Sequence, residues 1–155
     1  MYPQQESHPF QIQTVAGNAA VTALTASRFP NTQWLYVTRE PLPTSRGKTW
    51  EDQQEILDDV CEMAGRKYEP LTVQQACSAA FNLKAATGED LFPQENTEND
   101  VKRTYTRLEG AIGAGHFIVG RMGPTGLQVA IALDTMSLSS IGLHAAVVLG
   151  KNGEF

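Results

Sequence analysis

The hydrophobic pattern of this chain changes near Gly115, and this change constrains the fold more than any other feature of the sequence. Before it, three segments carry apolar residues at spacings of three and four, which is the pattern of amphipathic helices. After it, residues 116–122, 127–133 and 143–149 are short apolar runs separated by turn-forming sequences, which is typical of strands. This order predicts an α+β fold in which N-terminal helices pack on a C-terminal antiparallel sheet.

The first part of the chain contains a predicted strand and a predicted helix. Residues 32–38 are dense in aromatic and β-branched side chains, so they predict a strand, and a proline-containing loop follows it. The helix is expected to begin at Thr49 and to end at Gly65 or within residues 67–70.

Two further helices are expected before the strands. The second begins at Thr72, which has the capping-box spacing to Gln75, and ends at Gly88, a typical C-terminal cap. The third begins at Thr97 and carries its apolar stripe as far as Ile112.

The size and composition are those of one globular domain. The chain has 155 residues, of which 41% are hydrophobic, enough to bury a core without disulfide or metal cross-links. We expect a single domain over residues 1–155, in which residues 1–31 form a more loosely ordered N-terminal segment.

The charge pattern argues against several classes of partner. The formal net charge is -5, and no cluster of Lys or Arg is longer than a pair, so we expect neither nucleic acid nor an anionic membrane surface as the main partner. No apolar run approaches the roughly 18 residues of a membrane span. The N-terminus lacks the features of a secretory signal, so we expect synthesis in the cytoplasm and no membrane span.

Metal and cofactor motifs are not apparent. Cys61 and Cys77 are too few for a disulfide framework and do not form a C-x-x-C zinc motif. The sequence contains neither a His-Glu-x-x-His motif nor a complete phosphate-binding loop, so no metal and no cofactor is expected.

Cys77 has two interpretations. It lies on the apolar stripe of its predicted helix, and free cysteine is among the residues most often buried, so it can be a core residue. It also lies near the N-terminal end of that helix, where the helix dipole favours a thiolate. A catalytic thiolate would require an imidazole from elsewhere in the chain. Cys61 lies on an acid-rich helix and is expected to be a core residue.

Three histidines are candidates for that imidazole. His8 lies in the N-terminal segment and is the weakest of them. His144 and His116 each begin a predicted strand after the cysteine helix, and either can be brought to the sulfur by a strand that crosses the helix end. The segment "GHFIVGRMGPTGLQVAIALD" resembles the bacteriocin-processing and effector type of papain-like peptidase, in which a His opens one strand and an Asp closes the next. This resemblance implies that Asp134 fixes the orientation of the His116 imidazole.

Two segments carry a family resemblance. "CSAAFNLKAATGEDLFP" begins with Cys-Ser, continues as a helix that ends in Gly, and closes with Leu and Pro, while "HAAVVLGKNGEF" places a His before small and branched residues, a Leu-Gly and an Asn-Gly turn. In this order they resemble the nucleophile and histidine segments of NlpC/P60-type cysteine peptidases of the papain-like superfamily. The resemblance implies a papain-like fold with Cys77 as nucleophile, and it favours His144 over His116 as its base. Gln74 resembles the oxyanion-hole glutamine of papain-like enzymes.

The same resemblance implies an activity. It indicates a cysteine hydrolase that cleaves amide or peptide bonds, most similar to bacterial peptidoglycan amidases and endopeptidases. Such an enzyme would reach cell wall as a toxin or effector through a dedicated secretion system, with an inhibitor or immunity protein as a partner. Ala76 and Ala79, however, stand where the family usually has Asp and Gly.

Two alternatives stay open at this point. One is a non-catalytic interaction or assembly module that buries Cys77. The other is a host-directed effector protease or deamidase on the papain-like scaffold.

Overall fold

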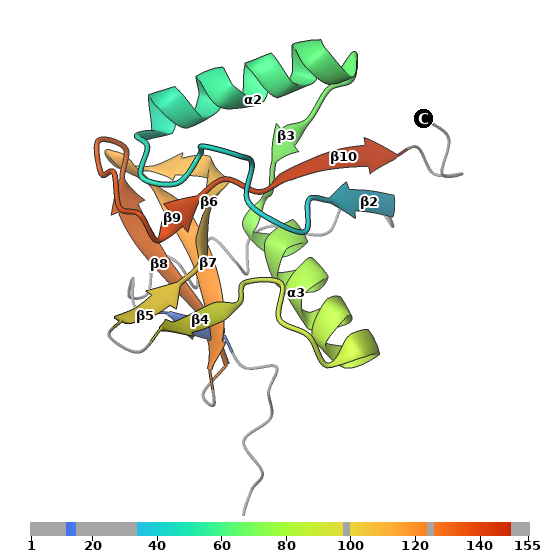
Figure 1. Ribbon diagram of the computed structural model, residues 1–155, viewed down its shortest axis with the longest axis vertical. Helices are drawn as coiled ribbons and strands as arrows, with labels where there is room; N and C mark the ends of the chain where they lie inside the picture. Colours follow the sequence, from blue (N-terminus) through green and yellow to red (C-terminus); the bar gives the residue numbers. More distant parts are fainter. Residues whose placement is uncertain (1–11, 15–33, 98–99, 124–125, 150–155) are drawn as a thin grey trace, which may run out of the picture.

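The protein has an α+β fold. The computed structural model describes residues 12–14, 34–97, 100–123 and 126–149. These residues form two helices, a five-stranded sheet, a three-stranded sheet and a two-stranded hairpin, labelled in Figure 1. The fold class predicted from the sequence is therefore confirmed.

The larger sheet contains five strands in the order β1-β8-β7-β6-β9. These are β1 (Ile12–Thr14), β6 (Tyr105–Ile112), β7 (Gly115–Gly123), β8 (Gly126–Leu133) and β9 (Ile141–Gly142). β6, β7 and β8 pair antiparallel in sequence order, whereas β1 pairs with β8 and β9 pairs with β6 in parallel. The predicted antiparallel pairing is therefore found for β7 and β8, whereas the parallel strands β1 and β9 make the sheet as a whole mixed.

The smaller sheet joins segments that are far apart in the chain. It contains β2 (Trp34–Val37), β10 (Ala145–Leu149) and β3 (Glu69–Pro70), with β10 in the middle and both neighbours antiparallel to it. A separate hairpin is formed by β4 (Gln94–Thr97) and β5 (Asp100–Arg103). β10, the third predicted C-terminal strand, therefore does not lie in the sheet of β7 and β8.

The two helices begin and end where their capping signals predicted. α2 (Trp50–Ala64) begins after Thr49 and α3 (Val73–Thr87) begins after Thr72, and both threonines complete a capping box. Gly65 and Gly88 end the two helices in the left-handed conformation, which a glycine adopts without steric cost. None of the described helices is long and apolar enough to cross a membrane.

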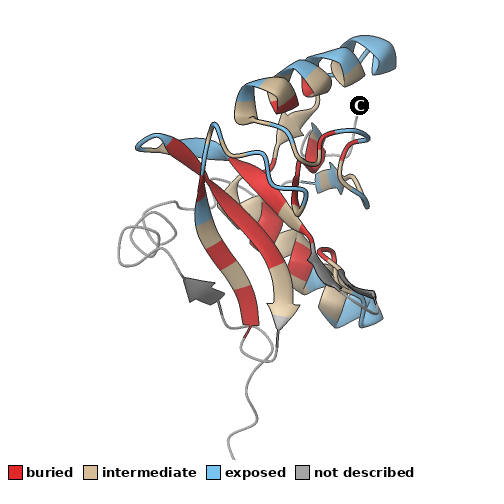
Figure 2. Ribbon diagram, turned by 60° about the vertical axis from the view of Figure 1, so that its left-hand side comes forward, coloured by how far each residue is buried: buried red, intermediate tan, exposed pale blue. Residues whose placement is uncertain are grey.

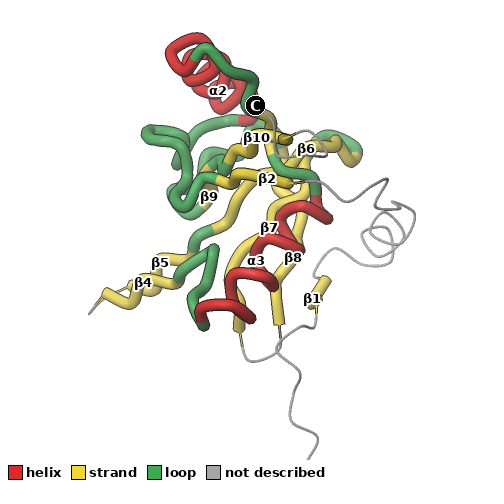
Figure 3. The backbone as a smooth tube through the Cα atoms, turned by 90° about the vertical axis from the view of Figure 1, so that its right-hand side faces the viewer, coloured by secondary structure: helices red, strands yellow, loops and turns green. Residues whose placement is uncertain are grey.

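Each helix covers a different part of the structure. α3 packs on one face of the larger sheet, where its buried residues share a core with Leu108, Phe117 and Val129 (Figure 3). α2 lies away from that core and contributes Leu57 to a second cluster, which includes Ala145 of β10. Figure 2 shows buried residues along the strands of the larger sheet and an exposed outer face on α2. The small sheet thus lies between the two helix-covered regions.

The third predicted helix is wrong. The segment from Thr97 to Ile112 instead contains the end of β4, all of β5 and all of β6. Its apolar residues do recur at helical spacing, but β6 is paired along β7 with Thr106 opposite Val119, a contact that no local pattern records. Its Thr-Tyr-Thr run favours a strand, and the long-range pairing follows that preference.

The order of helices and strands also differs from the prediction. The helices are not an N-terminal block, since β2 precedes them and β3 lies between them. Within the predicted loosely ordered segment 1–31, residues 12–14 form β1, and the rest lies outside the described residues. His8 also lies outside them.

Candidate functional site

Cys77 lies beyond the free amides of its helix. The preceding residue, Ala76, already donates its backbone N–H to the carbonyl of Thr72, at 2.9 Å. The backbone N–H groups that lack a partner within the helix therefore all lie before Cys77. The backbone N–H of Cys77 is consequently not available to stabilise an oxyanion.

The sulfur of Cys77 is enclosed by the main core. The residue is 7% exposed and packs in the cluster that contains Leu71, Phe92 and Phe117. Burial raises the pKa of the Cys77 thiol to about 11, because the thiolate would lose its hydration. At neutral pH the group is therefore almost entirely a thiol, which is a poor nucleophile.

His144 is buried without a polar partner for its ring. The residue is 0% exposed, its backbone N–H donates to the hydroxyl of Thr106 at 2.8 Å, and its ring packs edge-on against Phe92. Neither ring nitrogen forms a hydrogen bond of ordinary geometry with the described residues. The backbone of Arg39 lies near the ring and opposes the lowering of its pKa, but its effect is smaller than that of burial. Burial lowers the pKa of His144 to about 3. The ring is therefore neutral and is not hydrogen-bonded to Cys77.

His116 and Asp134 do form the predicted pair. Nδ1 of His116 lies 2.6 Å from Oδ1 of Asp134, and the imidazole stacks on Trp50 with ring centroids 3.9 Å apart. The next residue, Phe117, points into the core that contains Cys77. Because successive residues of a strand face opposite sides of the sheet, His116 faces away from the sulfur.

The predicted catalytic residues are therefore not assembled around the cysteine. His116 and Asp134 meet on one face of the larger sheet, while Cys77 lies on the other. Gln74 lies half-buried in the first turn of α3, and the neighbouring Gln75 accepts the backbone N–H of Thr72 as part of the capping box. In the described residues no hydrogen bond connects the sulfur to an imidazole.

A buried arginine, Arg107, lies on the His116 side of the sheet. This arginine is fully buried on β6. Its guanidinium donates to the side-chain oxygen of Gln53 at 3.0 Å and to the carbonyl of Met136 at 2.7 Å, as well as to two further backbone carbonyls. These bonds join the first turns of α2 to the end of β8. The His116 pair borders this structural cluster.

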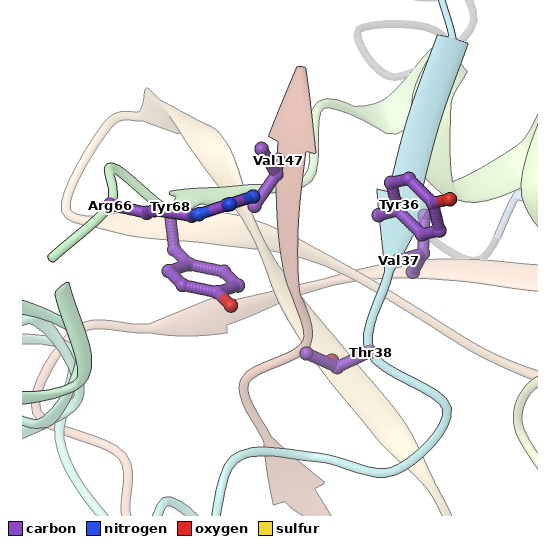
Figure 4. Close-up of a pocket in the computed structure, with 6 residues that line it drawn as sticks. All are labelled: Tyr36, Val37, Thr38, Arg66, Tyr68 and Val147. Carbon is purple, nitrogen blue, oxygen red and sulfur yellow. The ribbon is translucent and has the colours of Figure 1, made fainter. Parts of the chain in front are cut away.

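A cavity on the small sheet was not predicted from the sequence. Its volume is about 420 Å³, and Figure 4 shows the side chains around it. The lining residues come from β2, the segment after α2, and β10: Tyr36, Val37, Thr38, Arg66, Tyr68 and Val147. The aromatic content of residues 32–38 was the available signal, but nothing local shows that Arg66 and Val147 lie beside it.

Comparisons of the chain with protein-family models, with curated proteins and with solved structures found no match. Among the described residues, no group of three or more His, Cys, Asp or Glu is placed to hold a metal ion. The function is therefore inferred from the geometry of the chain itself.

Proposed function

We propose that the protein is a non-catalytic binding module whose ligand site is the cavity on the small sheet. The cavity carries this proposal because it is a concave, mostly apolar space built from three separate elements, which is the usual form of a ligand site. The buried Cys77 supports the non-catalytic part, since its thiol is uncharged and has no imidazole partner within the described residues.

A row of side chains across the sheet forms the base of the cavity. Tyr36 of β2 lies directly opposite Val147 of β10. On the other edge of β10, Glu69 of β3 pairs with Ala146. Because the two strands are antiparallel, the residue before Glu69, Tyr68, lies opposite the residue after Ala146, Val147. Directly opposed residues share a face of the sheet, so two aromatic rings flank one valine. This arrangement offers an apolar surface to a flat ligand.

The walls of the cavity are held by hydrogen bonds of the backbone. The N–H of Arg66 donates to the carbonyl of Cys61 at 3.2 Å, and Gly65 donates to Glu62, which together form a Schellman motif. The sulfur of Cys61 accepts the N–H of Tyr68 at 3.2 Å. The site is thus largely formed before a ligand arrives, which lowers the entropic cost of binding.

Binding of the neutral fluorescent probe N-phenyl-1-naphthylamine tests the proposal. The wild-type protein should increase the fluorescence of the probe saturably. Val147→Phe fills the cavity and should abolish that increase, whereas Val148→Phe, which changes the exposed neighbour on the opposite face of β10, should not. No saturable signal, or equal signals from both variants, would contradict the proposal.

A cysteine hydrolase is the second candidate. One contact favours it: the His144 ring packs on Phe92, which belongs to the same core as Cys77. Catalysis would require this core to open so that the sulfur and the imidazole meet. In that case the Cys77 thiol would pass its proton to His144 and attack an amide carbonyl, and the C–N bond would break as His144 protonates the leaving amine. Water would then hydrolyse the thioester and release the carboxylic acid.

The hydrolase is tested with two substrates. Purified peptidoglycan fragments test an amidase or endopeptidase, and an unfolded protein tests an effector protease. Activity that disappears in Cys77→Ala would support the enzyme. Equal product formation by the wild type and Cys77→Ala would remove this candidate.

A further inference from the structure

We infer that the cavity on the small sheet takes an organic monoanion, namely an apolar body that carries one carboxylate. This inference rests on the proposed binding function and specifies the ligand of the same site. Among the described residues that line the cavity, Arg66 is the one that carries a charge, and none is acidic.

The other side chains around the cavity fit an apolar body. Tyr36, Tyr68 and Val147 present aromatic and aliphatic surface, and Thr38 adds one hydroxyl. That hydroxyl already accepts the backbone N–H of Ala145 at 3.1 Å, so its position is fixed. Apolar contact thus accounts for most of the described lining.

The position of the guanidinium gives the ligand a direction. In Figure 4 the Arg66 side chain extends from its loop toward Val147, and Tyr36 lies across the sheet from it. A carboxylate at the Arg66 end would accept two N–H groups of the guanidinium in the planar, two-point geometry that arginine favours. The apolar body would then extend from the guanidinium toward the ring of Tyr36.

The neighbouring charges leave this preference intact. Lys67 follows Arg66 in the chain, but its ammonium lies 2.6 Å from the carboxylate of Glu69 on the exposed surface. The two opposite charges largely cancel at a distance. The part of the lining that the structure describes offers a guanidinium and no carboxylate, so it favours an anionic ligand over a cationic one. A carboxylate fits the planar, two-point geometry of that guanidinium.

Three ligands that share one body and differ in charge test the inference. These are 2-naphthylacetate, 2-(2-naphthyl)ethanol and 2-(2-naphthyl)ethylamine, and calorimetric titration measures each affinity. The carboxylate should bind about tenfold or more tightly than the alcohol, since hydrogen bonds to charged groups are the stronger class. The amine should bind more weakly than the alcohol.

Variants locate the origin of the preference. Arg66→Gln should remove the advantage of the carboxylate while the affinity for the alcohol stays the same. Arg39→Gln removes an equal charge from an arginine that pairs with Glu89 outside the cavity lining, and it should keep the advantage. Arg66→Lys should give an intermediate advantage, because the charge remains but the two-point geometry is lost.

The outcomes separate the two proposals. If the carboxylate binds no more tightly than the alcohol, or if Arg66→Gln keeps the advantage, the inferred ligand class is overturned while binding of the alcohol still supports the binding module. If none of the three ligands binds the wild-type protein, both the ligand class and the binding function are overturned. Circular dichroism of each variant confirms that it is folded.

Discussion

The two cysteines of this protein have opposite surroundings. Cys77 is enclosed by apolar residues of the main core, where burial raises the pKa of its thiol. Cys61 is half-buried and exchanges hydrogen bonds with the backbone of Tyr68, accepting its N–H at 3.2 Å and approaching its carbonyl at 3.5 Å. One cysteine therefore fills the core, and the other holds a residue of the cavity.

Alkylation should distinguish the two thiols. We expect iodoacetamide to leave Cys77 unmodified in the native protein near pH 6 and to modify it once denaturant is added, because a buried neutral thiol reacts only through opening of the core. The half-buried Cys61 should react faster. Peptide mass spectrometry measures both. Rapid native modification of Cys77 near pH 6 would instead support the hydrolase.

Substitution of Cys61 should affect the cavity. Cys61→Ala removes the acceptor of the Tyr68 N–H, so the free energy of unfolding should fall by about 1 kcal/mol and binding of the naphthyl probe should weaken. Cys61→Ser restores an acceptor and should recover much of the binding. Cys77→Ala is the matched control: it makes the same chemical change at a cysteine of the main core, and it should leave binding unchanged. If both alanine variants bind equally well, Cys61 does not position Tyr68.

At the scale of elements, local signals predicted helix ends and failed to predict strand partners. Thr72 and Gly88 bound α3 because capping depends on residues within one turn. In contrast, Tyr105 and Leu108 have helical spacing, yet they lie on β6 because β7 supplies its hydrogen-bond partners. Pairing between strands depends on residues that local periodicity does not include, so that segment was misassigned.

The two glycine caps allow a matched test of the loop that carries Arg66. Gly65 and Gly88 have φ values of 62° and 77°, and an added Cβ would meet no atom within 4 Å at either position. Each change to Ala should therefore cost about 1 kcal/mol through backbone strain alone. Gly65→Ala should also weaken naphthylacetate binding, because it disturbs the turn before Arg66. Titration of both variants measures this, and an equal loss of affinity in both would contradict the assignment.

At the scale of the whole molecule, the site depends on contacts between distant segments. Tyr36, Arg66 and Val147 meet because β10 returns to pair with β2 and β3, which lie far from it in the sequence. The sequence predicted the α+β class, both described helices and the contact of His116 with Asp134, each from signals within short spans. The sequence did not predict the cavity, because the cavity is lined by three segments that are far apart in the chain.

The buried imidazole of His144 should make the stability of the whole molecule depend on pH. Burial lowers the pKa of His144 to about 3 in the folded protein, whereas a histidine in the unfolded chain has a pKa of about 6.5. Between these two values the unfolded chain binds a proton that the folded protein does not bind. Lowering the pH from 6.5 toward 3 therefore stabilises the unfolded state, by about 1.4 kcal/mol per pH unit from this one group.

The variant His144→Leu isolates this contribution, because a leucine fills the same apolar site and does not titrate. Urea unfolding at pH 7, 6, 5 and 4 gives the free energy of unfolding for both proteins, and carboxylates common to both cancel in the difference. We expect the wild type to lose stability relative to the variant as the pH falls below 6.5, with little change in the difference above it. A difference that stays constant from pH 7 to pH 4 would mean that the folded protein admits a proton to this ring, and hence that the core around His144 and Phe92 opens to water.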